Sequence, residues 1–519
     1  MRLLTTDGLR SVSLACTLLS LATCLAQARA EEDANAPKRW SHEKAWEWYI
    51  RQPWLVGFNY VPSTACNTTE WWQAETFDPA TIDRELGWAA DVGFNTTRAF
   101  IQFLVWKHDP EGFKQRLDRF LALAAKHQIC VMPVLFDDCA FGEPRQTEPY
   151  LGKQREPIPG MILPSWTPSP GLSRVTDRRA WPDLEAYVRD VVGHFAGDER
   201  IVAWDLYNEP GNSGMGDRSR PLVEAAFRWA RQAEPSQPLT VSVWNGGLDA
   251  MNRVLLEQSD VVSFHAYTDY AGMVRQIDRY QQHLRPVICT EWMARPRGGR
   301  FDTELPLFKR RGVGCYQWGL VNGRTQAQFP WWNKPDGPVD PQFGWFHDVF
   351  HADGKPYRPE EIDVIRWYTA DKHLDWVVCY RPRPGEPARR PGEIDDADPC
   401  VEYSPGWTRV ELDGPRGGSL HYANQSGSTA ELTFTGTRID LLYKQGPDCG
   451  IARVLIDGAP ATPGQIDTYG QGVNWNAQAR LAQDLAAGEH VLRIEVTGNK
   501  HPKSSNGYVQ IVGFDVDVK

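Results

Sequence analysis

Short apolar runs that alternate with longer amphipathic segments predict the fold class, an α/β (β/α)8 TIM barrel followed by an all-β sandwich domain. Eight such runs lie between residues 54 and 375, and strands that alternate with helices are typical of βα units around a parallel sheet. From residue 398 to residue 519 the apolar runs are short and alternating, with turn signals between them, which is typical of a sandwich. An open doubly wound sheet is the alternative, but no glycine-rich phosphate loop follows the first strand.

The N-terminal 30 residues have the pattern of a secretory signal peptide. Arg2 and Arg10 supply the basic end, the segment from Val12 to Leu25 is mostly small and apolar, and Ala30 ends an A-x-A cleavage site. The residues before Cys24 do not match a lipoprotein signal, because a threonine stands directly before the cysteine. No later stretch reaches the roughly 20 apolar residues of a membrane helix. We therefore expect a secreted or periplasmic protein with no membrane span and no lipid anchor at Cys24.

The barrel domain is predicted at residues 54–375, after a helical lead-in at residues 31–53 that is rich in Trp and Glu. Runs of apolar, β-branched and aromatic residues predict its strands. These strands are Leu55–Tyr60, Thr96–Phe103, Ile129–Phe136, Ile201–Tyr207, Leu239–Val243, Val261–Ala266, Val287–Thr290 and Gly314–Leu320. Amphipathic patterns predict helices at Pro79–Val92, Gly112–His127, Leu184–Phe195, Pro221–Ala233, Ala250–Gln258, Ala271–His283 and Thr303–Arg311.

The C-terminal part of the chain is predicted to be a linker followed by the sandwich. Residues 376–397 are rich in Arg, Pro and Glu, which predicts the linker. Strands of the sandwich, residues 398–519, are predicted at Arg409–Leu412, Ser419–Tyr422, Ala430–Thr435, Ile439–Tyr443, Ile451–Ile456, His490–Val496 and Tyr508–Asp515. Trp407, Tyr469 and Trp475 are its candidates for sugar binding, and a purely structural module is the alternative.

The composition favours a carbohydrate ligand and disfavours a nucleic acid. The chain has 519 residues and a formal net charge of −10, which argues against binding to phosphate backbones or to anionic membranes. It contains 22 Trp, and aromatic faces stack on the apolar faces of sugar rings. The alternative for these tryptophans is a large aromatic core. Neither the composition nor the order of residues predicts a particular oligomeric state.

Two long segments follow predicted strands of the barrel. Residues 137–182 follow the third strand, are rich in Pro, Gly and Ser, and contain Trp166. Residues 321–345 follow the eighth strand and contain Trp331, Trp332, Phe343 and Trp345. Because long loops in compact domains are usually functional, we expect both segments to wall a sugar cleft. Surface decoration is the alternative.

The cysteines give no metal-site pattern. Cys130, Cys289 and Cys315 lie inside apolar strand-like runs, where cysteine is usually a small buried hydrophobe. No C-x-x-C pair or His/Cys cluster has the spacing of a metal site. Export makes disulfides possible, and Cys66–Cys139 is one candidate because both residues follow predicted barrel strands.

Two carboxylates follow predicted parallel strands, at the end of the barrel where such enzymes keep their chemistry. Glu209 lies in Asn208-Glu209-Pro210 after the fourth strand, where Pro210 stops the ladder. Glu291 follows the seventh strand directly. Glycosidases use two carboxylates that flank the scissile bond, so we predict Glu209 and Glu291 as the catalytic pair. The alternative for Glu209 is that it is an N-cap carboxylate in an ordinary strand-to-helix loop.

With these residues in place, the chain resembles the clan A glycoside hydrolases, and among them the family 5 cellulase-like group, over residues 54–370. That clan carries an Asn-Glu-Pro acid/base after strand four and a nucleophilic Glu after strand seven. Arg98 in the second strand, the His265-Ala266-Tyr267 pattern after the sixth and Trp318 at the end of the eighth also match. One departure is Phe136-Asp137-Asp138, where many family 5 members carry a histidine.

The resemblance implies retaining chemistry with no metal and no organic cofactor. Glu291 would attack the anomeric carbon, and Arg98 and Tyr267 would keep it ionised. Glu209 would act first as the acid and then as the base. For the other positions, the resemblance implies that His265 binds near Glu209, that Asn208 contacts the sugar 2-hydroxyl and that Trp318 stacks on the sugar.

The predicted function is that of a secreted retaining β-glycoside hydrolase acting on a polysaccharide or its oligosaccharides. Endo action on a β-1,4-linked glucan, mannan or xylan is the leading hypothesis, with exo action on a terminal sugar as the alternative. A non-catalytic carbohydrate-binding protein is the rival from another class, although such a protein has no need for both Glu209 and Glu291. A transglycosylase would share every one of these residues.

Overall fold

The computed structural model describes residues 38–339, 341–342, 344–370, 393–398, 401–486 and 489–517. The predicted signal peptide lies outside these residues, as do most of the predicted linker and Phe343. The predicted lead-in contains helix α2 (His42–Ile50). None of the helices in the described ranges combines the length and the apolar character that a bilayer-spanning segment requires.

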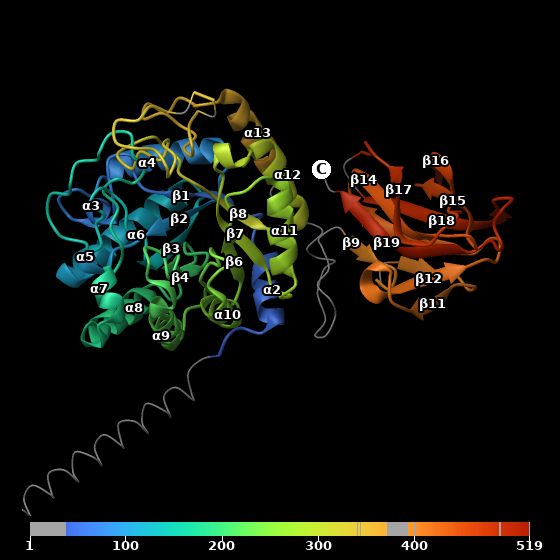
Figure 1. The fold of residues 1–519 in the computed structure, drawn as a ribbon, viewed down its shortest axis with the longest axis horizontal. Helices are drawn as coiled ribbons and strands as arrows, with labels where there is room; N and C mark the ends of the chain where they lie inside the picture. Colours follow the sequence, from blue (N-terminus) through green and yellow to red (C-terminus); the bar gives the residue numbers. More distant parts are fainter. Residues whose placement is uncertain are drawn as a thin grey trace, which may run out of the picture. The chain divides into compact units, whose positions relative to one another are not determined.

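The first part of the chain forms the predicted barrel of eight parallel strands, drawn in Figure 1. The strand order is β5-β4-β3-β2-β1-β8-β7-β6, and a parallel bridge between Val243 and Phe264 joins the two ends of this order. All eight predicted strands are confirmed. Their bounds are β1 (Val56–Tyr60), β2 (Thr96–Phe100), β3 (Cys130–Asp137), β4 (Trp204–Asn208), β5 (Leu239–Thr240), β6 (Val262–His265), β7 (Val287–Trp292) and β8 (Gly314–Trp318).

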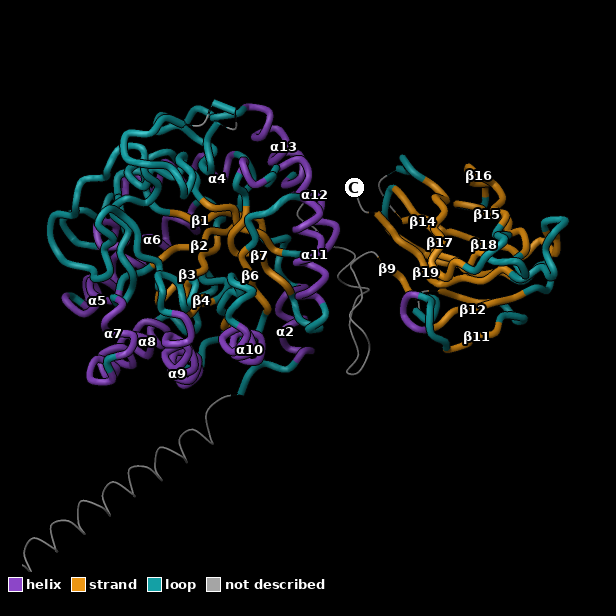
Figure 2. Tube along the Cα trace, viewed as in Figure 1, coloured by secondary structure: helices purple, strands orange, loops and turns teal. Residues whose placement is uncertain are grey.

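Helices surround these strands, as Figure 2 shows. The seven predicted helices are confirmed within a few residues as α4 (Pro79–Asp91), α6 (Pro110–Lys126), α8 (Trp181–His194), α9 (Arg220–Gln232), α10 (Asp249–Gln258), α11 (Tyr270–Gln281) and α12 (Phe301–Arg311), and α13 (Pro359–Thr369) follows. Local chemistry sets several of their ends. Asp78 and Asp109 cap α4 and α6, each followed by a proline at the first helical position. Gly312, at φ +56°, ends α12.

Three short α-helices among the described residues were not predicted, α3 (Thr68–Trp72), α5 (Phe103–His108) and α7 (Leu172–Thr176). The prediction that Phe103 ends the second strand is wrong, because the strand stops at Phe100 and Phe103 begins α5. The side chain of Gln102 caps this helix by accepting from the backbone N–H of Leu104 at 3.3 Å. A capping glutamine is not a strong helix-start signal, which explains the error.

Much of the tryptophan content forms the aromatic core that was the alternative to sugar binding. Trp54, Trp71, Trp72, Trp204 and Trp292 are all at most 1% exposed. Trp71 and Trp72 stack with ring centroids 4.5 Å apart, and both meet the edge of Phe120. Aromatic pairs of this kind add about 0.5–1.5 kcal/mol beyond the area they bury. The total Trp count is therefore a weaker sign of sugar binding than the individual Trp residues near the strand ends.

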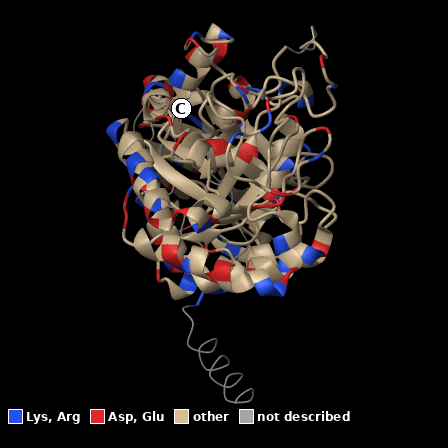
Figure 3. Cartoon of the chain, turned by 90° about the vertical axis from the view of Figure 1, so that its left-hand side faces the viewer, with Lys and Arg blue, Asp and Glu red and all other residues tan. Residues whose placement is uncertain are grey.

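Charged residues of both signs lie on the helical surface of the barrel in Figure 3. Exposed pairs such as Arg189 with Glu185 contribute little, typically below about 1 kcal/mol. A different pair lies inside the barrel, where Arg98 on β2 and Asp205 on β4 are both 0% exposed and 2.8 Å apart. Removing one partner of such a pair costs roughly 3–5 kcal/mol because the other charge stays buried.

The C-terminal part of the chain forms two antiparallel sheets, as the alternating pattern predicts. Their orders are β10-β13-β18-β15-β16 and β11-β12-β19-β14-β17, and β9 pairs with β19. The strands are β9 (Glu393–Asp395), β10 (Val401–Tyr403), β11 (Thr408–Glu411), β12 (Ser419–Ala423), β13 (Thr429–Thr435), β14 (Arg438–Gln445), β15 (Gly450–Ile456), β16 (Ala459–Asp467), β17 (Asn474–Ala482), β18 (Glu489–Lys500) and β19 (Val509–Asp517). Leu432, Leu441, Ile494 and Ile511 meet in the core between the sheets.

The seven predicted strands of this region are confirmed, and four further strands were missed. β9 falls in the predicted linker, and β10 and β17 carry weak apolar patterns. β16 contains Pro460, Pro463 and Gly464, which favour a turn. It forms a strand all the same because it lies at the edge of its sheet, where proline is tolerated.

Candidate active site

The turn that carries Glu209 is fixed by several contacts after β4. Glu209 has φ +44°, a left-handed conformation that non-glycine residues seldom adopt. The carbonyl of Pro210 accepts a hydrogen bond from Nε1 of Trp244 at 3.0 Å. The N–H of Gly211 donates to Oδ2 of Asp138 at 2.7 Å. These contacts hold a strained residue at the strand end, as is common where a side chain must be aimed at a ligand.

The carboxylate of Glu209 is enclosed and hydrogen-bonded on both oxygens. Oε1 lies 2.9 Å from Nδ1 of His265, at the end of β6. Oε2 accepts from Nδ2 of Asn212 at 2.5 Å and from the thiol of Cys139 at 3.3 Å. Loss of hydration on burial raises the pKa of Glu209, and this effect exceeds the opposing hydrogen bonds. The environment therefore favours a carboxyl group that keeps its proton above the usual pH range of glutamate.

Glu291 lies in the last part of β7 and is 5% exposed. Its Oε2 accepts a hydrogen bond from the hydroxyl of Tyr267 at 2.8 Å, the contact that the resemblance implies. One side-chain oxygen of Glu209, one ring nitrogen of His265 and one side-chain oxygen of Glu291 all lie within 4.8 Å of one another. Carboxyl groups about 5–5.5 Å apart are typical of retaining glycosidases, whereas inverting enzymes need roughly 6.5–9.5 Å.

Arg98 links three elements of the barrel beneath this pair. Its guanidinium donates to Oδ1 of Asn59 at 2.8 Å, to Oδ2 of Asp205 at 2.9 Å and to Oδ1 of Asn208 at 2.8 Å. Nδ2 of Asn208 in turn donates to Oδ1 of Asp137 at 2.9 Å. These contacts fix the amide of Asn208 beside Glu209. The expectation that Arg98 also acts on Glu291 stays a prediction.

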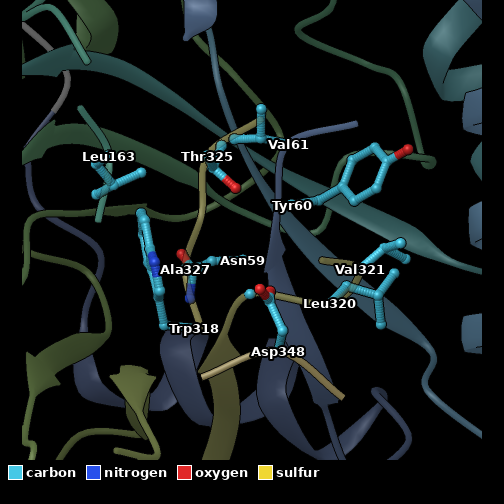
Figure 4. A pocket seen from close by; sticks show the side chains of 11 residues that line it. Asn59, Tyr60, Val61, Leu163, Trp318, Leu320, Val321, Thr325, Ala327 and Asp348 are labelled. Carbon is cyan, nitrogen blue, oxygen red and sulfur yellow. The ribbon is translucent and has the colours of Figure 1, made fainter. Parts of the chain in front are cut away.

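Trp318, at the end of β8, is 9% exposed. Its indole meets Phe100 edge-on at 5.6 Å between ring centroids and Trp166 at 6.3 Å. Trp166 comes from the long segment after β3, and its Nε1 donates to Oδ2 of Asp137 at 2.7 Å. That segment therefore contacts Trp318 and Asp137, and its role as a wall of a sugar cleft stays a prediction. Trp318 also lines a pocket at this end of the barrel, shown in Figure 4.

The sequence left Asp137, Asp138, Cys139 and Asn212 out of the candidate site, and the structure brings all four to Glu209 or to its turn. Burial raises the pKa of Asp137 to about 6 and that of Asp138 to about 7. Asp138 accepts from Tyr207, Gly211 and Ser219. The adjacent aspartates after the third strand were the visible signal, and the sequence analysis noted them only as a departure from the family 5 pattern.

The proposed Cys66–Cys139 disulfide is wrong, since both residues are free thiols. Cys66 lies near the backbone carbonyl of Arg155 at 3.8 Å, whereas the thiol of Cys139 points to Glu209. Sulfur of Cys139 also accepts from Nδ2 of Asn212 at 3.3 Å. Cys139 therefore belongs to the hydrogen-bond network of Glu209.

We predict that Cys139→Ala raises the pKa of the ionisation that sets the basic limb of the kcat/KM profile. The thiol donates to the charged form of Glu209 and so lowers its pKa. Without the thiol, the carboxyl holds its proton to higher pH. The measurement is kcat/KM against pH, with Cys139→Ser as the matched control because a hydroxyl also donates. Identical basic limbs in Cys139→Ala and the wild type would exclude this coupling.

Asp138 provides a prediction about stability and pH. Its pKa of about 7 in the fold lies above the ordinary value of 3.8, so between these pH values the folded chain keeps a proton that the unfolded chain has lost. The contribution of Asp138 is fully present at low pH and is lost as pH rises towards 7, at up to about 1.4 kcal/mol per pH unit. Asp138→Asn, which cannot ionise, should therefore gain Tm relative to wild type between pH 4.5 and pH 7.5. Calorimetry at both pH values tests this, and an unchanged Tm difference contradicts it.

Glu209, His265 and Glu291 also form a donor set that could hold a metal ion, by distance alone. His265 already contacts Glu209 through Nδ1, and Tyr267 contacts Glu291. A bound cation would engage both carboxylates at once and would hold Glu209 ionised, which opposes a role as proton donor. The chemistry of the set therefore fits a pair of reacting carboxylates better than a metal centre.

Comparisons with known proteins give one family match and partial matches to curated proteins. Residues 63–318 match the family model described as cellulase (glycosyl hydrolase family 5). Among curated proteins, 113 residues are 33% identical to an A-type blood N-acetyl-α-D-galactosamine deacetylase of Flavonifractor plautii, which is 21% of this chain and 14% of that protein. A further match, 29% identical over 132 residues, is to an A-type blood α-D-galactosamine galactosaminidase of the same organism, covering 24% of this chain and 11% of that protein. The chain therefore spans only a small part of these two relatives.

Similar solved structures include the following three proteins. A GH5_18 protein of Streptomyces cattleya, crystallised with Manβ1-4GlcNAc, is 12% identical with a TM-score of 0.43, over 66% of this chain and 83% of that chain. An exo-β-1,4-mannosidase of Opitutaceae bacterium strain TAV5 is 19% identical with a TM-score of 0.42, over 62% and 60%. An endo-1,4-β-D-mannanase of Thermotoga petrophila RKU-1 is 15% identical with a TM-score of 0.40, over 61% and 99%.

The family match spans the strand ends that carry both carboxylates, from residue 63 to Trp318. Its position agrees with the eight-stranded parallel barrel and with the short distance between Glu209 and Glu291. The protein thus has an eight-stranded parallel barrel that resembles glycosyl hydrolase family 5 over residues 63–318, followed by an all-β region at its C-terminal end.

Proposed function

We propose that this protein is a retaining β-glycoside hydrolase that acts on a polysaccharide or its oligosaccharides by double displacement. The observation that carries the proposal is the short separation of Glu209 and Glu291, whose atoms lie within 4.8 Å together with His265. The signal-peptide pattern of residues 1–30 supports a secreted or periplasmic location as part of the same proposal.

The two carboxylates have environments suited to different roles. Tyr267 donates to Glu291, and a hydrogen bond to the charged form favours an ionised nucleophile. Burial raises the pKa of Glu209, which favours a protonated acid. In the first step, Oε of Glu291 bonds to the anomeric carbon, the glycosidic C–O bond breaks and Glu209 gives its proton to the leaving oxygen. In the second step, Glu209 takes a proton from water, whose oxygen replaces Glu291 at the carbon.

Three further side chains support the sugar in this proposal. Asn208, oriented by Arg98 and Asp137, contacts the 2-hydroxyl. Trp318 presents its indole to the ring face. His265, bound to Oε1 of Glu209, orients the acid and exchanges its proton with the surroundings.

The stereochemistry of the first product tests the proposal. The enzyme is incubated with β-configured nitrophenyl glucoside, mannoside, xyloside and galactoside, and with cellohexaose, mannohexaose and xylohexaose. Proton NMR then follows the anomeric signals before mutarotation. We expect the β-anomer to form first from the substrate that reacts. The α-anomer as the first product would contradict double displacement.

The same experiment separates the two rival functions. A transglycosylase produces oligosaccharides longer than the substrate at millimolar substrate concentration, because sugar rather than water intercepts the intermediate. A non-catalytic binding protein produces no new anomeric signal with any substrate, yet shifts the signals of the sugar that it binds.

We also predict that chelators leave this activity unchanged. The proposed steps use only the side chains of Glu209 and Glu291, and a cation on their shared donor set would compete with the substrate. Dialysis against EDTA followed by a rate measurement in metal-free buffer should give the untreated rate. A loss that Zn²⁺, Mn²⁺ or Ca²⁺ restores would contradict this prediction.

A further inference from the structure

Asp137 ends β3 at the position where the sequence departs from the family 5 pattern, and it takes no part in the two proposed chemical steps. The residue is 4% exposed and pairs with Asn208 in the parallel register of β3 and β4. Its backbone exchanges two hydrogen bonds with Ser169, at 2.7 Å and 3.0 Å. The long segment after β3 therefore leaves the barrel at Asp137 and returns to the same residue.

Three N–H groups from different parts of the chain donate to the carboxyl group of Asp137. Oδ1 accepts from Nδ2 of Asn208 and from the backbone N–H of Cys139, both at 2.9 Å. Oδ2 accepts from Nε1 of Trp166 at 2.7 Å. Because every partner donates, the ionised carboxylate, which only accepts, is the form that satisfies all three. Burial raises the pKa of Asp137 to about 6, so the side chain has this form at neutral pH.

On the Oδ1 side, Asp137 determines which way the amide of Asn208 is turned. The amide oxygen accepts from the guanidinium of Arg98 at 2.8 Å, and the amide nitrogen donates to Asp137. A cation on one side and an anion on the other select one orientation, since the reversed amide would oppose donor to donor and acceptor to acceptor. The second N–H of the amide contacts the sulfur of Cys139, a weak acceptor, at 3.4 Å. A sugar hydroxyl can take over this weakly bound N–H.

On the Oδ2 side, Asp137 holds Trp166, which is 1% exposed. The indole of Trp166 meets Trp318 with ring centroids 6.3 Å apart and Phe100 with centroids 5.3 Å apart, both edge-on. Trp318 is the residue that presents its indole to the sugar ring in the proposed function. One buried carboxylate thus fixes both the amide that contacts the 2-hydroxyl and the support of the stacking surface.

We propose that Asp137 is a positioning residue for the sugar that reacts. Its Oδ1 turns the amide of Asn208 so that an N–H meets the 2-hydroxyl oxygen, and its Oδ2 anchors Trp166 against Trp318. This inference rests on the proposed function and narrows its substrate class to glycosides with a free 2-hydroxyl on that sugar. A histidine at this position would present at most one acceptor, so it could not accept from both Asn208 and Trp166.

The 2-hydroxyl contact is measured with two substrates, the nitrophenyl β-glycoside that reacts and its 2-deoxy analogue. Each kcat/KM is divided by the rate of spontaneous hydrolysis of the same compound, because loss of the 2-hydroxyl by itself makes a glycoside more reactive. The quotient of the two corrected values is the preference for the 2-hydroxyl. We expect Asp137→Ala to lower this preference by roughly tenfold to 100-fold, mainly through kcat, because the contact strengthens in the transition state.

A merely structural role of Asp137 would lower the rates of both substrates equally, and two further variants separate the cases. Asn208→Ala removes the amide, so addition of Asp137→Ala to it should leave the preference unchanged. Asp138→Asn is the matched control, because Asp138 accepts from Gly211 in the turn after Glu209, and it should keep the wild-type preference.

Equal losses on both substrates in Asp137→Ala would overturn the inference and leave the proposed chemistry intact. A wild-type enzyme without any preference for the 2-hydroxyl would overturn it as well. If the wild type hydrolyses no glycoside at all, the proposed function itself fails.

Asp137→Asn separates the two oxygens of the carboxylate. Its one amide oxygen should stay with the two donors Asn208 and Cys139, so that its NH2 group faces the indole N–H of Trp166. We therefore expect this variant to keep most of the preference and to lose rate on both substrates. Trp166→Phe removes the opposed N–H and should lower Tm less in Asp137→Asn than in the wild type. This comparison remains a test if Asp137→Ala does not fold, and equal losses of Tm would overturn the inference.

Discussion

Replacement of Glu291 by alanine should lower kcat by at least about 10⁴-fold, the order of loss seen when the nucleophile of a covalent mechanism is removed. Glu291 is the carboxylate that bonds to the anomeric carbon in our proposal, and Tyr267 is the partner that keeps it charged. The variant should keep its fold, since Glu291 lies at the end of β7 rather than in the middle of the sheet. The measurement is the steady-state rate on the best nitrophenyl glycoside.

Azide provides a second result for Glu291→Ala. Without the carboxylate there is room for a small anion beside the anomeric carbon, and attack by azide on an activated substrate should restore part of the rate. The product is then the α-glycosyl azide, because a single displacement inverts the centre. Glu257→Ala is the control, since Glu257 is exposed on helix α10. A variant at Glu291 that retains more than a tenth of the wild-type rate would contradict its role.

Glu209→Ala should show a loss that depends on the leaving group. General acid–base catalysis contributes roughly 10²–10⁴-fold, and a natural sugar leaving group needs this proton more than 2,4-dinitrophenolate does. We therefore expect a large fall in kcat/KM for oligosaccharides and a small one for the dinitrophenyl glycoside. Comparison of the two substrates measures the effect, and equal losses on both would contradict the assignment.

The pH profile of Glu209→Ala gives an independent check. Burial raises the pKa of Glu209, so its deprotonation defines the basic limb of the wild-type kcat/KM profile, above which the acid form is lost. Measured on an oligosaccharide, whose leaving group needs the proton, the limb should disappear in Glu209→Ala. Persistence of the basic limb in Glu209→Ala would assign that ionisation to another group.

The sequence predicted the barrel well because each strand is a compact run of apolar residues. Strands buried on both faces, such as β1 and β2, have no polar face to interrupt the pattern. The predicted secondary structure was wrong where a side-chain cap or an edge position in the sheet determines where an element forms or ends. Gln102 caps α5 and ends the second strand early, and β16 forms with prolines because only one of its sides is paired. Neither effect follows from local propensity.

The candidate site was predictable where residues follow strands directly. Glu209 and Glu291 were predicted because each follows a predicted strand and the carboxyl ends of parallel strands converge at one end of a barrel, whereas Tyr267 was predicted from the resemblance alone. Cys139 and Asn212 were not found, since their contacts with Glu209 depend on how two loops fold back. The hydrogen bonds between the loops that follow β3 and β8, such as that from the N–H of Leu163 to the carbonyl of Thr325, have no sequence signal either, because most of them involve backbone groups.

The most direct test of the central claim is mass spectrometry of the intact protein after exposure to 2-fluoro glycosyl fluorides with gluco, manno, xylo and galacto configurations. These reagents trap the covalent intermediate of a retaining enzyme. The account predicts one added sugar, located by peptide mapping on Glu291 and absent in Glu291→Ala. A label on another residue, or hydrolysis of a sugar whose matching reagent leaves Glu291 unlabelled, would contradict it.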